Sequence, residues 1–480
     1  MKKTGLFKTI MCVLFGIILL SWIFSASYFT EGELMELGMY QLGFIDFFDL
    51  FFASFEFQYF LQILILLISV GAFYGVLNKT GKYRAWIERI VNNFKGAEFV
   101  FLLIVAFAIT ALTSIFDYGL NLFIFIPFLI SIILAMGYEK ITACLATFGA
   151  LLVGTIGSTW GAKTAALIGE TIALESSTTL SIARLALLLV SLILLVVFLA
   201  KAKRTKLVKN EKEDMFLGEK ISNKYSIVPI IVVFSLLFVL MVLGCTNWVS
   251  TFKLEVFENI HKSVVEFEVN LPHFNVTTEG VDAGMEKIAI FGKLLGNIRA
   301  FGNWYYAEMT IMVLVATMVI MLFYRIKLND GFEYMTEGAK KMAKPALLVV
   351  LAYSVIYFSG NSMFYPTIAS LILGITDKFN LFFTTIATVM GSFLHVDTLY
   401  LVNYVVPQIA AQEVDGIIVA ILTQGIYGVT MLIAPTSAVM ALGLSYLGIS
   451  YKEWFKNIWK FALCLFAAVI ATTIVLMIIL

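Results

Sequence analysis

Packing does not explain Lys163, because this charged residue lies in a stretch that otherwise suits the interior of a membrane. Residues 141–168 are apolar except for a break at 157–164, which contains Ser158, Thr159, Lys163 and Thr164. A charge at bilayer depth costs roughly 2.5–3.5 kcal/mol on insertion scales, so it usually faces a partner or a polar cavity. The small and hydroxyl residues around it suit an unwound helix centre that presents backbone groups to a ligand. The pattern predicts a transport site.

Three further polar interruptions lie inside apolar runs, so that each half of the chain contains two. The turn between two apolar arms of the first half contributes Ser114, Asp117 and Asn121 as candidate substrate-binding residues. In the second half the corresponding candidates are His395, Asp397, Thr398, Gln424, Tyr427, Thr436 and Ser437, and Asn361 completes the set. Pro435 frees a backbone carbonyl one turn earlier. Freed carbonyls suit cations and helix N-termini suit carboxylates, so an organic acid or amino acid fits such a site.

Each candidate has a structural alternative. A hydroxyl residue or glycine in a membrane helix commonly serves packing. Asp117 and Lys163 could each lie at a membrane boundary, and Glu170 follows Lys163 closely. His395 could be a core histidine bonded to a carbonyl, and otherwise it is the natural proton-linked group. Arg184 is expected to extend its side chain toward the membrane surface.

The composition is that of a polytopic membrane protein. Hydrophobic residues make up 61% of the 480 and charged residues only 14%, with a mean hydropathy of +0.95, unlike a soluble chain. Several apolar runs approach the ~20 residues that span a bilayer: 10–27, 57–76, 180–200, 227–243, 309–323 and 459–480. Nothing indicates a nucleic-acid partner, and no metal-ligand spacing, P-loop or nucleophile motif is present. We therefore expect no cofactor, no metal and no enzymatic activity.

Charge asymmetry predicts the orientation. Lysines flank the first apolar run, whereas residues 30–56 contain no Lys or Arg. The positive-inside rule then places the N-terminus in the cytoplasm and 30–56 outside. The later basic segments fall on the cytoplasmic side when the intervening apolar runs are counted as membrane crossings, which agrees with this assignment. The chain is expected to be a multi-pass protein of the cytoplasmic membrane.

The order of the apolar runs predicts an inverted repeat. The expected units are a first repeat at 1–200, with a hairpin at about 98–137 and a broken helix at 141–168; a cytoplasmic linker and connecting transmembrane helix at 201–245; an extracellular loop with interfacial helices at 246–304; and a second repeat at 305–480, with a hairpin at about 380–412 and a broken helix at 416–447. The hairpins are re-entrant in this interpretation, although their arms could also be full spans. The predicted fold class is an all-α polytopic membrane protein with about nine transmembrane helices.

Several motifs resemble one known family. Residues 71–81, 125–128 with 135–140, 301–304, 334–341, and 433–437 followed by 451–455 are similar to the YfcC-type, four-carbon-dicarboxylate anaerobic carrier-like proteins. That family belongs to the ion transporter superfamily, alongside the p-aminobenzoyl-glutamate transporters. The resemblance implies a homodimer with a scaffold part and a mobile transport part, which moves substrate by an elevator motion.

The chain departs from the family pattern in the regions expected to bind. Leu120-Asn121 replaces paired glutamates, 161–162 (Gly-Ala) replaces Asn-Pro, 396–400 replaces Ser-Gly-Ser-Gly-Gln, and 425–427 replaces Gly-Asp-Gly. Loss of carboxylate and amide ligands beside a new ammonium is expected if Lys163 occupies a former sodium position. The hypothesis that follows from Lys163 is sodium-independent transport. The sequence by itself leaves the coupling ion open between Na⁺ and H⁺.

The predicted function is secondary active transport of a small carboxylate-bearing metabolite: an amino acid, a short peptide or a dicarboxylate. An exporter or exchanger of organic anions or drugs is the nearest alternative. The alternative of another class is a polytopic membrane enzyme, but residues 246–304 show no catalytic spacing. The expected partners are the substrate, a coupling ion, the lipid bilayer and a second copy of the chain.

Overall fold

The protein is a bundle of apolar helices. The computed structural model describes residues 5–30, 32–160, 163–175, 177–203, 216–219, 221, 224–277, 280–296, 298–376 and 378–480. In these ranges eight helical segments are long and apolar enough to cross a membrane: α3 (Gln58–Lys79), α5 (Glu98–Phe116), α10 (Thr178–Leu199), α12 (Val228–Cys245), α16 (Tyr306–Phe323), α17 (Leu328–Ser362), α22 (Gly416–Ile433) with α23 (Ala438–Leu447), and α24 (Tyr451–Ile479). The predicted all-α polytopic membrane fold is confirmed.

Shorter elements connect these spans. In the first half they are α1 (Leu6–Ser21), β1 (Ala26–Thr30), β2 (Glu33–Gly38), α2 (Asp46–Glu56), α4 (Lys82–Asn93), the 3-10 helix η1 (Gly119–Ile124), α6 (Ile126–Ala135), α7 (Lys140–Cys144), the π-helical η2 (Leu145–Gly149), α8 (Ala150–Ile156) and α9 (Lys163–Thr171). In the second half they are α13 (Trp248–Phe252), α14 (Val256–Val265), β3 (Glu268–Thr277), β4 (Gly280–Ala289), α15 (Ile290–Leu295), α18 (Tyr365–Leu373), α19 (Leu381–Leu394), α20 (Thr398–Tyr404) and α21 (Val406–Ala410).

Both halves contain a turn between apolar helices and an interrupted helix, as the sequence predicts. In the first half α5 ends at Asp117, which adopts the left-handed conformation with φ of 49°, and η1 and α6 follow. In the second half α19 ends at His395, and Asp397 caps the start of α20. The interruptions lie between α8 and α9 and between α22 and α23. Residues 161–162 of the first interruption lie outside the described residues.

The helices pack as two groups. α3, α12, α16 and α17 form one group, and α5, α8, α10, α22 and α24 form the other, with α17 and α23 in contact between them. The α3–α17 crossing is the most extensive, and it depends on small residues. A Cβ at Gly338 would lie 2.1 Å from the carbonyl oxygen of Gly71, and one at Gly75 would lie 2.2 Å from that of Tyr334. The spacing of Gly71 and Gly75 is the small-residue pattern that lets membrane helices approach closely.

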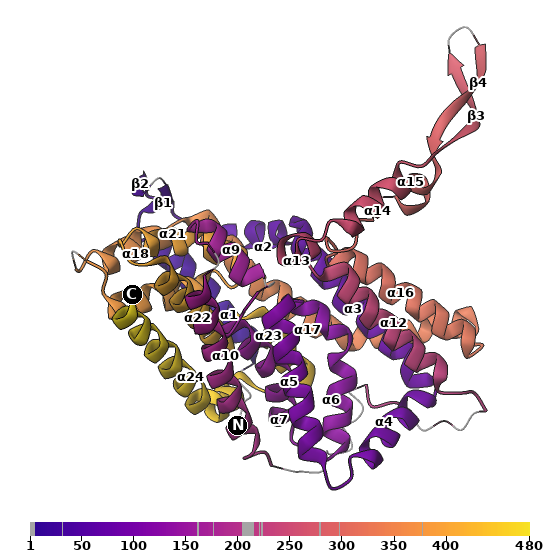
Figure 1. The fold of residues 1–480 in the computed structure, drawn as a ribbon, viewed down its shortest axis with the longest axis horizontal. Helices are drawn as coiled ribbons and strands as arrows, with labels where there is room; N and C mark the ends of the chain where they lie inside the picture. Colours follow the sequence, from indigo (N-terminus) through magenta and orange to yellow (C-terminus); the bar gives the residue numbers. More distant parts are fainter. Residues whose placement is uncertain are drawn as a thin grey trace.

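Two antiparallel hairpins depart from the helical expectation. β1 pairs with β2, and β3 pairs with β4 in a register that runs from Glu268 opposite Ala289 to Thr277 opposite Gly280. The β3–β4 ribbon projects far from the helical body (Figure 1). The predicted interfacial helices of 246–304 correspond to α13, α14 and α15, and the β3–β4 ribbon is an element that the prediction did not include. The alternation of polar and apolar residues at 268–271 was a strand signal.

Two basic segments differ in what the structure describes. The segment 325–344 forms most of the first half of α17, which continues through Pro345 and ends at Met363 in the left-handed conformation. The predicted cytoplasmic linker falls largely outside the described residues, at 204–215, 220 and 222–223.

Candidate functional site

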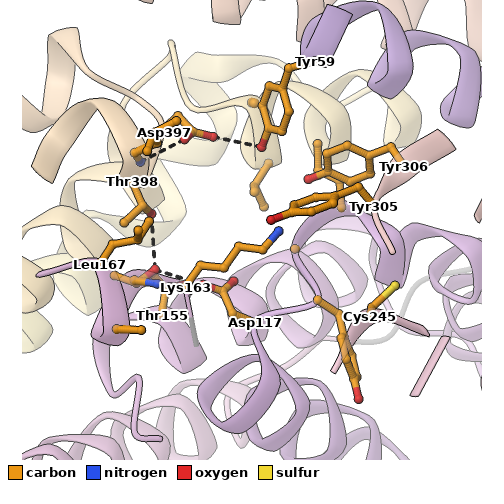
Figure 2. A pocket seen from close by; sticks show the side chains of 18 of the residues that line it. Tyr59, Asp117, Thr155, Lys163, Leu167, Cys245, Tyr305, Tyr306, Asp397 and Thr398 are labelled. Atoms are coloured by element: carbon orange, nitrogen blue, oxygen red, sulfur yellow. Dashed lines mark hydrogen bonds between the residues drawn. The ribbon is translucent and has the colours of Figure 1, made fainter. Parts of the chain in front are cut away.

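A cavity of about 610 Å³ lies where the two halves of the chain meet. Its walls come from the start of α3, the turn after α5, α8, α9, the segment before α16, α17, the turn before α20, α22 and the start of α23. Figure 2 shows its polar side chains converging on one space. Seven of the predicted residues line it: Asp117, Lys163, Thr164, Asp397, Thr398, Tyr427 and Ser437.

Lys163 is the first residue of α9 and extends into the cavity (Figure 2). Its ammonium nitrogen lies 3.9 Å from the centroid of the Tyr305 ring, a cation–π contact. The Arg299 guanidinium lies 5.3 Å from the same ring and pairs with Glu308 at 3.6 Å. Within the described residues no carboxylate forms a salt bridge with Lys163. The ammonium is positioned by an aromatic face and left able to pair with a ligand.

Two aspartates occupy the starts of two short helices at the cavity. Asp117 Oδ2 accepts hydrogen bonds from the backbone N–H of Thr164 at 3.2 Å and from its hydroxyl at 3.0 Å, at the start of α9. Asp397 Oδ1 accepts from the N–H of Leu399 at 3.0 Å and its Oδ2 from the Tyr59 hydroxyl at 3.2 Å (Figure 2). Carboxylates are favourable at helix N-termini because they satisfy free N–H groups and complement the helix dipole.

The two halves are joined at this point by hydroxyl groups. The oxygens of Thr164 and Thr398 lie 3.2 Å apart, so the first interruption and the second turn share a hydrogen bond. Tyr427, from α22, donates to the carbonyl of Val396 at 3.1 Å and fixes the backbone just before Asp397. The site therefore combines side chains from both halves of the chain.

The carbonyl groups freed by the first interruption are held by donors of the chain itself. Ser114 Oγ donates to the carbonyl of Gly157 at 2.6 Å. Gln424 Nε2 donates to the carbonyls of Ile156 and Ser158, each at 3.0 Å. The Gln424 Oε1 and Ser158 Oγ atoms are buried and have no hydrogen-bond partner among the described residues. These predicted residues lie together behind the cavity and are not part of its lining.

Arg184 completes the same set of contacts from α10. Its guanidinium donates to the carbonyl of Thr159 at 3.4 Å and to that of Ala165 at 3.3 Å, and the side chain is only 8% exposed. The expectation that Arg184 extends toward the membrane surface is wrong. The buried Arg184 side chain instead bridges the first interruption and the start of α9. The backbone N–H of Thr159 in turn donates to the carbonyl of Ser114 at 2.8 Å.

Four predicted residues take part in other local contacts outside the cavity lining. His395 is buried, contacts the carbonyl of Gly391 at 3.1 Å and stacks on Tyr404, which matches the core-histidine alternative. The other three residues are hydrogen-bond donors. Asn121 donates to Cys245 Sγ at 3.6 Å, Thr436 to the Phe393 carbonyl at 3.2 Å, and Asn361 to the Tyr357 carbonyl at 2.8 Å.

The main feature absent from the sequence-based prediction is an aromatic lining. Seven tyrosines border the cavity, and only Tyr427 is among the predicted residues: Tyr59, Tyr118, Tyr305, Tyr306, Tyr353, Tyr400 and Tyr427. They are scattered along the chain, and no local spacing groups them. They come together only because the folded chain brings α3, α17, α22 and the turns beside them to one cavity.

Comparison with known proteins identifies the family. A sequence model of DcuC, the C4-dicarboxylate anaerobic carrier family, matches residues 58–478. The chain belongs to this family. The resemblance predicted from its motifs is thus confirmed, and membership supports membrane transport as its activity.

Individual relatives are distant. An uncharacterized protein of Haemophilus influenzae is 29% identical over 98 residues, a match that spans 20% of this chain and only 19% of that protein. The crystal structure of the Alcanivorax borkumensis YdaH transporter, described as having an unusual topology, aligns over 97% of this chain and 96% of that one, with 11% identity and a TM-score of 0.40.

Proposed function

We propose that the chain is a secondary active transporter of a small carboxylate-bearing metabolite, bound in the cavity between the two halves. The observation that carries this proposal is Lys163, whose ammonium faces the cavity without a carboxylate partner among the described residues. An unpaired ammonium that faces such a cavity favours an anionic ligand. Membership of a carrier family supports the same assignment.

An elevator motion fits the two packing groups. The α3–α12–α16–α17 group is the proposed scaffold, and the α5–α8–α10–α22–α24 group is the proposed mobile part. Substrate bound at the start of α9 and α20 would move with the mobile part past Tyr305 and Tyr59, which belong to the scaffold side. We propose that the transporter works as a homodimer in the cytoplasmic membrane, with its N-terminus inside.

Loss of Lys163 is expected to reduce transport strongly without affecting folding. Lys163→Ala should reduce uptake by roughly 10- to 100-fold, the value of one charge-assisted contact to a carboxylate. The lysine makes no ion pair among the described residues, so its removal breaks none. Uptake into proteoliposomes measures the effect, with purified yield and oligomer size as folding checks.

The matched control is Lys452→Ala, an exposed lysine near the start of α24 and outside the cavity lining. This variant should transport as the wild type does. Wild-type uptake by Lys163→Ala would contradict the proposal, and turnover of a substrate without flux would favour a membrane enzyme instead.

We also propose that coupling does not require sodium. The carbonyl oxygens that an interrupted helix would offer to Na⁺ already accept from Ser114, Gln424 and Arg184. Among the described residues Lys163 contacts Tyr305 and forms no hydrogen bond with a carbonyl of the interruption. Arg184 and Gln424 do form such bonds, so they are better suited than Lys163 to replace a coupling cation. Proton coupling or exchange remains as the driving process.

Uptake into proteoliposomes is therefore expected to be the same in sodium and choline buffers. The measurement compares initial rates with an inward Na⁺ gradient and with an equal choline gradient at fixed pH. A second series imposes a pH gradient or preloads unlabelled substrate. Strict dependence on Na⁺ would contradict sodium-independent coupling and leave the assignment as a transporter intact.

A further inference from the structure

The charges that line the cavity are unbalanced toward the acidic side. Asp117, Glu170 and Asp397 contribute three carboxylates, whereas Lys163 is the one cationic side chain in the described lining. The formal balance of these side chains is −2. A ligand with two carboxylates would place one beside Lys163 and the other among like charges, and like charges repel strongly in a partly desolvated site.

The helix starts that would otherwise bind a second carboxylate are already occupied. Asp117 accepts from the N–H of Thr164 at the start of α9, and Asp397 accepts from the N–H of Leu399 at the start of α20. The start of α23 also borders the cavity, and its cap is the neutral hydroxyl of Ser437, which accepts from Met440. The cavity thus offers one full positive charge and two carboxylates that retain free lone pairs.

The aromatic lining adds a second preference for cations. The faces of tyrosine rings attract ammonium groups at about 6 Å or less from the centroid. Lys163 itself demonstrates this in the cavity, with its nitrogen 3.9 Å from Tyr305. Tyr59 donates to Asp397, which joins one of these rings to one of the carboxylates. Rings and carboxylates together form a site suited to a substrate ammonium.

We propose that the substrate is an amino carboxylate, with its carboxylate paired to Lys163 and its ammonium group bound between Asp117, Asp397 and the tyrosine faces. The inference rests on the proposed transport of a carboxylate-bearing metabolite and narrows its substrate class. It separates this chain from carriers that need two cationic anchors for two carboxylates. Amino acids and short peptides meet the requirement, and simple dicarboxylates do not.

A matched ligand series tests the charge pattern on the purified full-length protein. The first panel contains three ligands of similar length: succinate carries two carboxylates, 4-aminobutyrate carries one carboxylate and one ammonium group, and putrescine carries two ammonium groups. A second panel contains the standard amino acids and dialanine. Binding is measured as a ligand-dependent rise in the unfolding temperature, because a ligand stabilises the folded state by mass action. At least one amino carboxylate should bind tenfold or more tightly than succinate.

The outcomes separate the two proposals. Tightest binding by succinate would overturn the amino carboxylate and keep the carboxylate transporter. Binding by putrescine alone would overturn both, because no carboxylate would then be recognised. The absence of any shift across both panels would also overturn both proposals.

Charge variants give an independent readout. Asp397→Asn and Asp117→Asn preserve the local backbone, because asparagine caps helices well and tolerates a positive φ. Each should weaken the binding of the preferred amino carboxylate by roughly 10- to 100-fold, as expected for loss of a charge-assisted hydrogen bond. The same variants should leave succinate binding equal or tighter. Equal loss for both ligands would overturn the assignment of the aspartates to the ammonium.

Lys163→Gln should give the opposite pattern and weaken every carboxylate ligand. Glu333→Gln is the charge-matched control for the two aspartate variants, since it also removes one negative charge and Glu333 is exposed on α17 and does not line the cavity. This control should leave all the affinities unchanged. A loss of amino carboxylate binding in Glu333→Gln would attribute the effect to overall charge and contradict the proposed site.

Discussion

Replacing Gly338 with alanine is expected to destabilise the protein by about 3 kcal/mol or more, the upper end of the usual cost of overpacking. The new Cβ would lie 2.1 Å from the carbonyl oxygen of Gly71 and 2.7 Å from the Cα of Gly75. Both atoms belong to the backbone of α3, so no side-chain rotation relieves the contact. α3 and α17 would have to separate along the most extensive helix crossing of the molecule.

The control for Gly338 lies in the same helix. A Cβ at Gly360 of α17 meets nothing within 4 Å, so Gly360→Ala should stabilise the helix by roughly 0.5–1 kcal/mol through propensity alone. The comparison is the unfolding temperature of the two alanine variants in the same detergent, together with the yield of monodisperse protein. Equal unfolding temperatures would show that the α3–α17 contact does not depend on close backbone approach.

The elements that the sequence predicted are those with local signals. Apolar runs identify the spans, and a charge or a group of hydroxyls within such a run identifies the turns and interruptions, because a bilayer penalises both. Asp117, Lys163 and Asp397 were found in this way, and the structure brings all three to one cavity. The local sequence was enough to identify these residues, but not to predict that they lie close together in space.

The contacts that the sequence did not reveal join residues that lie far apart in the chain. Gln424 contacts Ile156, 268 positions earlier in the chain, and Tyr59 contacts Asp397, 338 positions later. Neither pairing leaves a periodic pattern, since each depends on which helix ends meet. Arg184 was misjudged for a related reason: an arginine near a helix end usually reaches water, and only the interruption beside it provides carbonyl partners at depth.

Replacing Arg184 with alanine is expected to lower stability and to change the response of the protein to sodium. The variant leaves the carbonyls of Thr159 and Ala165 without their donor, at about 1–3 kcal/mol for each buried acceptor. It also removes a cation that the described residues do not pair with any carboxylate. Part of the loss is thereby offset, because a buried charge is itself costly to desolvate. A net loss of about 2–4 kcal/mol follows.

The freed oxygens give this prediction a sharper test than stability alone. Carbonyl oxygens are the ligands that hard cations prefer, and the alanine leaves space where the guanidinium was. Sodium should therefore raise the unfolding temperature of Arg184→Ala above its value in choline, whereas the wild type should be indifferent. Arg184→Lys is the matched control, because it keeps a cation in the pocket and should remain insensitive to sodium. Equal unfolding temperatures of Arg184→Ala in the two salts would mean that the arginine only fills space. The argument for sodium-independent coupling would then rest on Ser114 and Gln424.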